Sequence, residues 1–228
     1  MSHSAGTSAA TNIEDSQHLR REVIATALAM NAAGINVNNA GNVSARCLRG
    51  TRSGFLLTPS AIPYAKLTPE DLVFVDGSGA TVGTRAPSSE WRFHFEIYAA
   101  RTDIDAIVHA HSPHATALAC HGLGIPAFHY MIAVAGGPDI RCAEYETFGT
   151  QELADRAVAA LEGRTACLLA HHGVIACGKD LERALALAIE VENLARTYLL
   201  VRSIGEPKLL DGAEMQRVLQ RFENYRPE

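Results

Sequence analysis

The sequence predicts an α/β fold: a three-layer α/β/α arrangement in a single domain, with helices on both faces of one sheet. Helix-period patterns alternate with short apolar runs along almost the whole chain, and neither an internal repeat nor a long linker interrupts them. The chain has 228 residues, 47% of them hydrophobic, which suffices for one large core. These patterns leave the direction of the strands open.

The N-terminal residues 1–15 are predicted to be a disordered tail, followed by a domain of residues 16–228. The first dozen residues are rich in Ser, Ala and Thr, and they lack the basic start and apolar centre of a signal peptide. A first helix is expected over residues 14–32, where apolar residues such as Leu19 and Val23 recur at helical spacing.

The first half of the domain is predicted to supply short strands and one further helix. A Gly/Asn-rich stretch leads into a strand at residues 43–46, and residues 54–58 and 72–76 form two more strands between turn residues. Ser88 or Ser89 is expected to cap a helix that ends near residue 101.

The second half is predicted to continue the alternation of strands and helices. An apolar run at residues 104–108 is typical of a buried strand, and a short helix is expected to end at Ala119. Further strands are expected at residues 126–133 and 167–170. The remaining expected helices cover residues 150–162, residues 180–202 and a final segment opened by a capping box of Asp211 and Glu214.

Composition and charge exclude several classes of protein. The formal net charge of −5 argues against a general nucleic-acid binder, and no apolar run has the length of a membrane span. Five cysteines without a CxxC pair fit a reducing cytosol better than a disulfide framework, so a cytoplasmic location is expected. Neither a Walker A pattern nor GxGxxG supports a nucleotide site.

Two histidine clusters at strand ends predict a metal site. His109 and His111 follow a buried apolar run, and because strand side chains alternate, both point the same way and can hold one ion. His171 and His172 follow a second such run, where adjacent side chains would point to opposite faces. Only one of this pair should reach the metal, and the residues alone do not say which. The alternative is a set of structural histidines without an ion.

Glu90 and the serines before it form a second candidate group. Glu90 lies in the first turn of the expected helix, where a carboxylate also aligns favourably with the helix dipole without any catalytic role. Ser88 and Ser89, with free backbone N–H groups at a helix start, would suit an anion such as phosphate. Residues 41–44 and 58–61 offer similar small polar loops, whose commoner role is to form turns.

Four further histidines lie near these candidates in the sequence. His94 follows Glu90 by one helical turn and could orient its carboxylate, or equally well lie at the surface. His114, His121 and His129 could support the metal ligands through hydrogen bonds. Each is more simply an ordinary, partly buried histidine, so none of these three is assigned as a ligand.

Short motifs surround the candidate residues. They are Ala40-Gly41-Asn42-Val43-Ser44, Thr58-Pro59, Ile62-Pro63-Tyr64, Pro87-Ser88-Ser89-Glu90-Trp91-Arg92-Phe93-His94, Val108-His109-Ala110-His111, Ile125-Pro126, His129-Tyr130-Met131-Ile132, Phe148-Gly149-Thr150 and His171-His172-Gly173. Together, from about residue 17 to Tyr225, they resemble the class II aldolases of the L-fuculose-phosphate aldolase family, which also includes adducin head domains and sugar-phosphate 4-epimerases. The resemblance implies the class II aldolase fold, whose central sheet is mixed and mostly antiparallel.

The resemblance also implies a cofactor and its ligands. A zinc ion (Zn2+) would be held by His109, His111 and His172, which selects the second histidine of the adjacent pair. Glu90 matches the carboxylate that touches the metal at rest and acts as the base in catalysis. The expected contacts to the substrate phosphate come from Gly41, Asn42, Ser60, Ala61, Ser88 and Ser89.

Further implications of the resemblance concern Ala61 in the phosphate loop and the aromatic residues expected around the aldehyde. Ala61 stands where a glycine is usual, and its backbone N–H contact is expected to survive if the local conformation does not need a positive φ. Tyr130 matches a tyrosine that reaches the site from the neighbouring subunit of a cyclic homotetramer and protonates the aldehyde oxygen. Phe148, Phe222 and Tyr225 match residues that wall the aldehyde pocket.

The function implied is a zinc-dependent aldolase that reversibly cleaves a ketose 1-phosphate, such as L-fuculose 1-phosphate, to dihydroxyacetone phosphate and a short aldehyde such as lactaldehyde. An aldolase of 5-deoxyribulose or 5-methylthioribulose 1-phosphate differs only in the aldehyde tail, which the sequence leaves open. A 4-epimerase typically carries an acidic residue near Tyr130, and none occurs between Asp105 and Asp139. An adducin-like binding module would not need all these histidines with Glu90 and Tyr130. No nucleic-acid or membrane partner is expected.

Overall fold

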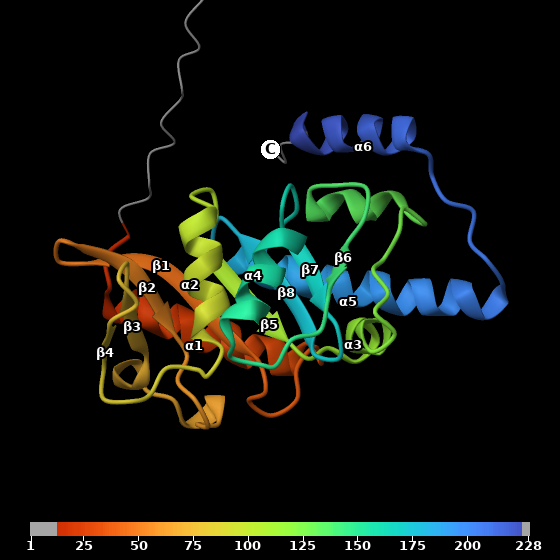
Figure 1. Ribbon diagram of the computed structural model, residues 1–228. Coiled ribbons are helices and arrows are strands. Elements are labelled where there is room, and N and C mark those ends of the chain that lie inside the picture. Colours follow the sequence, from red (N-terminus) through yellow and green to blue (C-terminus); the bar gives the residue numbers. More distant parts are fainter. Residues whose placement is uncertain (1–12, 225–228) are drawn as a thin grey trace, which may run out of the picture.

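A computed structural model describes residues 13–224, and its eight strands form one sheet (Figure 1). The strand order across the sheet is β4-β3-β2-β1-β5-β8-β7-β6. Neighbouring strands are antiparallel except β6 and β7, which are parallel, so the mixed, mostly antiparallel sheet is confirmed. The strands are β1 Asn42–Arg49, β2 Arg52–Leu57, β3 Val73–Asp76, β4 Thr81–Val82, β5 Ala106–Ala110, β6 Arg141–Ala143, β7 Ala166–Leu169 and β8 Gly173–Gly178.

Helices cover both faces of the sheet and complete the three layers (Figure 1). One layer contains α1 (Gln17–Ala32), α3 (Pro113–Ala119) and α5 (Leu181–Ile204), and the other contains α2 (Trp91–Ala100) and α4 (Gln151–Ala160). Three short 3₁₀ helices and one further α-helix lie outside these layers: η1 Tyr64–Lys66, η2 Pro69–Asp71, η3 Tyr130–Ala135 and α6 Gly212–Asn224. Within residues 13–224, no helix is both long and apolar enough to cross a membrane.

Alternating residues of each strand supply two separate cores. In β5, Ala106 and Val108 are buried against the layer of α1 and α5, whereas Ile107 is buried against α2 and α4. Because strand side chains alternate, His109 shares the face of Ile107. The side chain of His109 therefore lies beneath the layer of α2 and α4, where the candidate site is found.

The segment 126–133, expected to form a strand, does not do so. Its chain enters η3, a 3₁₀ helix from Tyr130 to Ala135. Pro126 has no N–H to donate to a strand ladder. The buried Ile132 and Ala135 nevertheless reach the core next to α1 and α5. Apolar residues can be buried from a 3₁₀ helix as well as from a strand, so the apolar run did not decide between them.

The N-terminal boundary of the folded part also differs from expectation. α1 begins at Gln17, three residues later than expected, because the Ser16 side chain caps it. Residues 13–15 lie beside β1 instead, where the N–H of Asp15 donates to the carbonyl of Leu48 at 2.7 Å. These three residues of the expected tail are thus held by the domain.

The last helix lies apart from the three layers, beside η3 (Figure 1). The carboxylate of Asp211 accepts the N–H of Glu214 at 2.8 Å, which is the N-terminal cap that the capping-box pattern predicts. Apolar side chains on the inner face of α6, including Val218 and Phe222, pack against the core residues of this region. α6 therefore forms one wall of a cleft whose other wall is η3.

Candidate active site

Four side chains with metal-ligating atoms meet at the end of β5, under the layer of α2 and α4. His109 lies in β5 and His111 directly follows this strand. His172 lies in the turn between β7 and β8, and Glu90 directly precedes α2. Because β5 and β8 are paired neighbours in the sheet, the turn before β8 places its histidine next to those of β5.

The three imidazoles surround one point. The ring centroids of each pair are 4.9 Å apart, and the ring planes are steeply inclined to one another. One ligand atom from each histidine and from Glu90 lies within 4.8 Å of all the others. Tetrahedral ligands about 2.0–2.1 Å from a zinc ion lie about 3.4 Å from one another. The Nε2 atoms of His109 and His111 are 3.1 Å apart, so the cluster has the dimensions of a metal site.

The surroundings of the cluster fit a divalent cation. The Nδ1 of His109 lies 3.0 Å from the carbonyl oxygen of Val174, to which it donates, so the lone pair of a neutral ring is on Nε2, facing the other ligands. Glu90 is buried, and its Oε1 lies 2.9 Å from Nε2 of His172 without a hydrogen bond. A buried carboxylate oxygen without a hydrogen bond is energetically costly, and a cation bound at this position would compensate its charge.

Burial and neighbouring charges oppose one another at Glu90 and act in the same direction at His111. Burial on its own raises the pKa of Glu90, but the imidazoles of His109 and His172 outweigh it and hold the pKa well below its ordinary value. Burial, reinforced by the same two imidazoles, lowers the pKa of His111 to about 4. Near neutral pH the carboxylate is therefore charged and His111 neutral, and both of these forms can ligate a metal ion.

The two adjacent histidines of the turn point in different directions. His172 joins the cluster, whereas His171 is exposed and places its ring edge-on to Tyr145, with 5.7 Å between the ring centroids. The φ of His171 is 55°, in the left-handed region that few residues other than glycine adopt. A turn conformation, not the alternation of a strand, therefore separates the two side chains.

A cleft of about 280 Å³ opens over the cluster, between the start of α2 and the loop that precedes α4. Phe148, expected in the aldehyde pocket, lies at this cleft. Sequence reasoning did not single out Tyr145 and Glu146, which line the cleft too; their only signal is that they precede the Phe-Gly-Thr motif. The lining residues are Ala40, Ser89, Glu90, His111, Tyr145, Glu146, Phe148, His171 and His172.

Three serines expected to hold a phosphate lie together at the start of α2. Glu90, and not a serine, occupies the N-cap position, while Ser88 Oγ accepts the backbone N–H of Glu90 at 3.3 Å. Ser60 Oγ accepts the N–H of Ser89 at 3.1 Å and donates to the carbonyl of Pro87 at 2.9 Å. These hydrogen bonds connect the loop that contains Ser60 to the segment just before α2, and Ser89 lines the cleft.

The Asn42 side chain, expected to contact phosphate, is buried and already bonded within the protein. Its Nδ2 lies 2.9 Å from Glu90 Oε2 and 3.1 Å from Ser88 Oγ, and its Oδ1 lies 2.5 Å from His94 Nε2. These contacts use both N–H groups of the amide, so a phosphate would have to compete for them. The phosphate role of Asn42 stays a prediction.

Two backbone positions in these loops have unusual geometry. A Cβ at Gly41 would lie 2.2 Å from the carbonyl oxygen of His109, so only glycine lets the start of β1 pass this close to β5. Ala61 adopts a φ of 60°, in the left-handed region. The backbone N–H of Ala61 was expected to keep its phosphate contact only if the local conformation does not need a positive φ, and this condition is not met. Alanine is strained at this position, and a glycine would not be.

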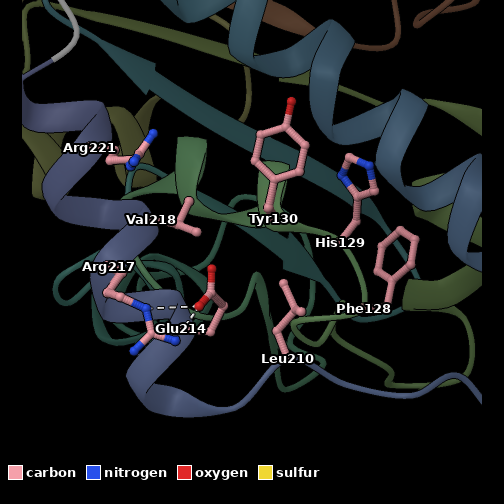
Figure 2. Close-up of a pocket in the computed structure, with 8 residues that line it drawn as sticks. All are labelled: Phe128, His129, Tyr130, Leu210, Glu214, Arg217, Val218 and Arg221. Carbon is pink, nitrogen blue, oxygen red and sulfur yellow. Dashed lines mark hydrogen bonds and ion pairs between the residues drawn. The ribbon is translucent and has the colours of Figure 1, made fainter.

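Tyr130 lies in a different cleft from the metal-ligating cluster (Figure 2). This second cleft, of about 610 Å³, is formed by η3 and α6 and is lined by Phe128, His129, Tyr130, Leu210, Glu214, Arg217, Val218 and Arg221. Tyr130 is half exposed, and Phe222 stacks on it with 6.5 Å between the ring centroids. One chain therefore places Phe148 beside the cluster but Phe222 beside Tyr130. Tyr225 lies outside the described residues.

The remaining candidate histidines are bonded elsewhere or exposed. His114 contacts the Glu192 carboxylate at 2.7 Å, and the Nδ1 of His129 accepts the N–H of Met131 at 3.2 Å. His121 is exposed. His94 is fully buried behind Glu90, to which it connects through Asn42.

The chain is similar over most of its length to known proteins. Residues 21–199 match the family model described as Class II Aldolase and Adducin N-terminal domain. A 5-methylthioribulose-1-phosphate/5-deoxyribulose-1-phosphate aldolase of Rhodospirillum rubrum is 52% identical over 207 residues, covering 91% of this chain and 92% of the relative. An L-fuculose phosphate aldolase of Escherichia coli is 49% identical over 208 residues, covering 91% and 95%. A solved structure of an L-fuculose 1-phosphate aldolase has a TM-score of 0.87 at 42% identity, over 91% of this chain and 97% of that one.

Proposed function

Because this chain belongs to the class II aldolase and adducin family, we propose that it is a zinc-dependent aldolase of a ketose 1-phosphate such as L-fuculose 1-phosphate. It is a metal-dependent lyase of sugar phosphates, and the zinc ion, the particular sugar and the aldehyde are the parts that are proposed. The products would be dihydroxyacetone phosphate and a short aldehyde such as lactaldehyde. The observation that carries the proposal is the cluster of three imidazoles and Glu90 beneath an open cleft.

His109, His111 and His172 would hold the ion, with Glu90 beside it. When bound, the ion would supply a Lewis acid that stabilises the negative charge developing on the donor half of the sugar. Neutral imidazole ligands suit this task, because they leave the positive charge of the site undiminished.

Glu90 is the proposed base for the carbon-bound proton of dihydroxyacetone phosphate. Aldol addition requires removal of this proton by a group within hydrogen-bond reach of the donor carbon. Glu90 is charged, lines the cleft and is the acidic residue among the four clustered ligands. Burial on its own favours the protonated form, so the carboxylate is a stronger base when no positive charge, from an ion or from a protonated imidazole, engages it.

The substrate phosphate is assigned to the start of α2, next to Ser60, Ser88 and Ser89. Backbone N–H groups at a helix start and serine hydroxyls suit an anion without a basic cluster. None of the described residues that line the cleft is a lysine or an arginine. Contacts at the phosphate lie far from the breaking bond and would position the reacting carbons beside Glu90.

The proton for the aldehyde oxygen is assigned to Tyr130 of a neighbouring copy of this chain in a homotetramer. Supporting this assignment, Tyr130 is half exposed and lies in a cleft separate from that of its own Glu90. The alternative proton donor is Tyr145, a phenol that lines the same cleft as Glu90 within one chain.

A second candidate substrate class is 5-methylthioribulose or 5-deoxyribulose 1-phosphate. The observation that favours it is the 52% identity to the Rhodospirillum rubrum aldolase of these sugars. Phe148 and Tyr145 give the cleft an aromatic wall, against which a methyl or methylthio tail can be buried as readily as lactaldehyde.

A substrate panel tests the proposal. L-fuculose, 5-deoxyribulose and 5-methylthioribulose 1-phosphates, each with its unphosphorylated counterpart, are scored for release of dihydroxyacetone phosphate or free dihydroxyacetone. We expect kcat/KM to be high for one phosphorylated sugar and much lower for its free form. Equal turnover of both forms would contradict the phosphate site. Failure to cleave any of them, together with no bound metal in elemental analysis, would favour an adducin-like binding module.

A further inference from the structure

A chain of buried polar groups runs from the interior of the α2 layer to Glu90. The hydroxyl of Tyr98 lies 2.8 Å from Ser44 Oγ, which lies 2.7 Å from Nδ1 of His94. The other ring nitrogen of His94 lies 2.5 Å from Oδ1 of Asn42. The amide of Asn42 then reaches both Glu90 and Ser88. Few of these atoms contact solvent, since His94 and Ser44 are 0% exposed and Asn42 is 2% exposed.

The direction of every hydrogen bond in this series of polar groups follows from its last member, the carboxylate of Glu90. A carboxylate only accepts hydrogen bonds, so the Asn42 atom beside it must be Nδ2. Oδ1 therefore faces His94, whose Nε2 must carry the proton and donate. Nδ1 is left as an acceptor for the hydroxyl of Ser44, which in turn accepts from Tyr98. Burial lowers the pKa of His94 to about 3, in keeping with a neutral ring.

The same directions fix the role of the Ser88 hydroxyl. Its oxygen accepts from Nδ2 of Asn42 at 3.1 Å and from the backbone N–H of Glu90 at 3.3 Å. Both lone pairs are thereby used, and the remaining O–H is free to donate to an acceptor such as a phosphate oxygen. If the amide of Asn42 turned over, Oδ1 would face the Glu90 carboxylate and take up the hydrogen of Ser88.

We propose that His94 is a positioning residue, which acts through Asn42 to hold Glu90 in place and to keep the Ser88 hydroxyl free as a donor. The inference rests on the proposed function, in which Glu90 moves the proton and Ser88 binds the phosphate. The Nε2–H of His94 and the Glu90 carboxylate favour the same orientation of the Asn42 amide, so the buried imidazole holds in place the arrangement of both Glu90 and Ser88. His94 does not line the substrate cleft, and its ring nitrogens bond to Ser44 and Asn42 and not to the imidazoles of the metal-ligating cluster.

A purely structural role for His94 is the alternative that the test must separate. The ring stacks on Phe93 with 4.6 Å between the centroids and lies 6.4 Å from Phe55, so it also fills space in the core. A structural role predicts that any side chain of similar volume serves equally well. The positioning role predicts that only a side chain with a donor toward Asn42 does so.

Glutamine and methionine at position 94 provide the matched pair, because their side chains have similar length and only glutamine can donate to Asn42 and accept from Ser44. We expect His94→Met to lower kcat about 10- to 100-fold, the range for a misplaced catalytic group. Its affinity for inorganic phosphate, measured by calorimetry, should fall several-fold. His94→Gln should recover most of both quantities, and both variants should keep the wild-type metal content.

The exposed His121 supplies the control, since its glutamine and methionine variants should not differ in kcat. Equal losses in His94→Gln and His94→Met, or no loss in either, would overturn the positioning role. So would loss of metal from both variants.

Ser44→Ala provides a second variant if His94→Met fails to fold. It removes the donor to Nδ1 of His94, so the ring can exchange its proton between the two nitrogens, and a smaller loss of kcat is expected. The ¹⁵N shifts of the His94 ring report the tautomer without any activity measurement. A neutral ring protonated on Nε2 is expected in the wild-type protein. A ring protonated on Nδ1 would overturn the inference even if the substrate panel succeeds, whereas a failed panel with an Nε2–H ring would count against the proposed function alone.

Discussion

At the scale of single residues, His171 and His172 show what a sequence pattern can and cannot decide. The apolar run before them correctly places a pair of histidines at a strand end, next to His109 in space. The choice within the pair does not follow from strand alternation, because both residues lie in the turn after Leu169, where β7 ends. The left-handed φ of His171 separates them, and such a local conformation is set by the tertiary structure of the turn.

We predict that His172→Ala and His171→Ala affect metal binding very differently. His172 is one of the four clustered ligands, and a catalytic site with three imidazoles cannot spare one. His171 is exposed and turned toward Tyr145. Elemental analysis of the purified variants should show a sharp fall in metal for His172→Ala and most of the wild-type content for His171→Ala. The reverse result would contradict the assignment.

Asn42 illustrates a different limit at this scale. Its motif correctly places it next to Glu90 and Ser88, but the bonds that occupy its amide come from elements separated along the chain. Helical spacing allowed either an orienting contact from His94 to Glu90 or a surface position for His94. The structure buries His94 and connects it to Glu90 only through Asn42, a group that helical spacing cannot reveal.

At the scale of secondary-structure elements, the long helices and most of the central strands were predictable from their apolar patterns. The exception in the middle of the sheet is β8, a buried strand of six residues that the sequence analysis did not predict. The other errors fall on short or irregular elements. β4 has only two residues and β6 only three, too few to show a period. The segment that forms η3 carries an apolar run, and an apolar run alone cannot distinguish a strand from a buried 3₁₀ helix.

The loop that carries Ser60 yields a prediction about stability. Ala61 holds a φ of 60°, which costs a residue with a Cβ about 1–2 kcal/mol relative to glycine. Glycine costs more entropy on folding, about 0.4–1 kcal/mol, so Ala61→Gly should raise the free energy of unfolding by up to about 1.5 kcal/mol. Denaturant titration measures this. Asn38→Gly, at a φ of 58°, is the control and should change stability less, because asparagine tolerates this region. A destabilised Ala61→Gly variant would show that the loop is not strained.

At the scale of the whole molecule, one chain divides the proposed proton-transfer residues between two clefts. Glu90 lies under the cleft beside α4, and Tyr130 lies in the cleft between η3 and α6. The sequence predicted both residues through their motifs. Which chain completes which site depends on how copies of the chain assemble, and no pattern within a single chain encodes that arrangement directly.

The division predicts separate defects for two variants. Glu90→Gln should abolish both aldol turnover and hydrogen exchange at the donor carbon of dihydroxyacetone phosphate, because both need the same base. Tyr130→Phe should lower aldol turnover by about 10²–10⁴-fold, the usual loss for a positioned acid, and leave the exchange largely intact. Exchange into deuterated water, followed by NMR, measures the two reactions apart. An equal loss of exchange in both variants would mean that Tyr130 serves the donor half or the fold.

Mixing the two inactive variants then tests whether sites are shared between chains. If Tyr130 acts on a neighbouring copy, hybrids of Glu90→Gln and Tyr130→Phe subunits should recover some turnover, since some sites would contain one intact residue of each kind. Subunit exchange is verified by native mass spectrometry. Well-mixed hybrids without any recovery would place both proton transfers within one chain and would favour Tyr145 as the acid.

The ligand cluster has a consequence for the energetics of the entire fold. Glu90, His109 and His172 lie far apart along the chain, so an ion held by them would join distant segments as a covalent cross-link does. Near saturation, each tenfold rise in free metal should add about 1.4 kcal/mol to the free energy of unfolding, provided that the unfolded chain does not bind the ion. Unfolding in metal-buffered solutions measures this slope, which His171→Ala should keep and His172→Ala should flatten. The melting temperature of the protein would then serve as a gauge of the metal available to it.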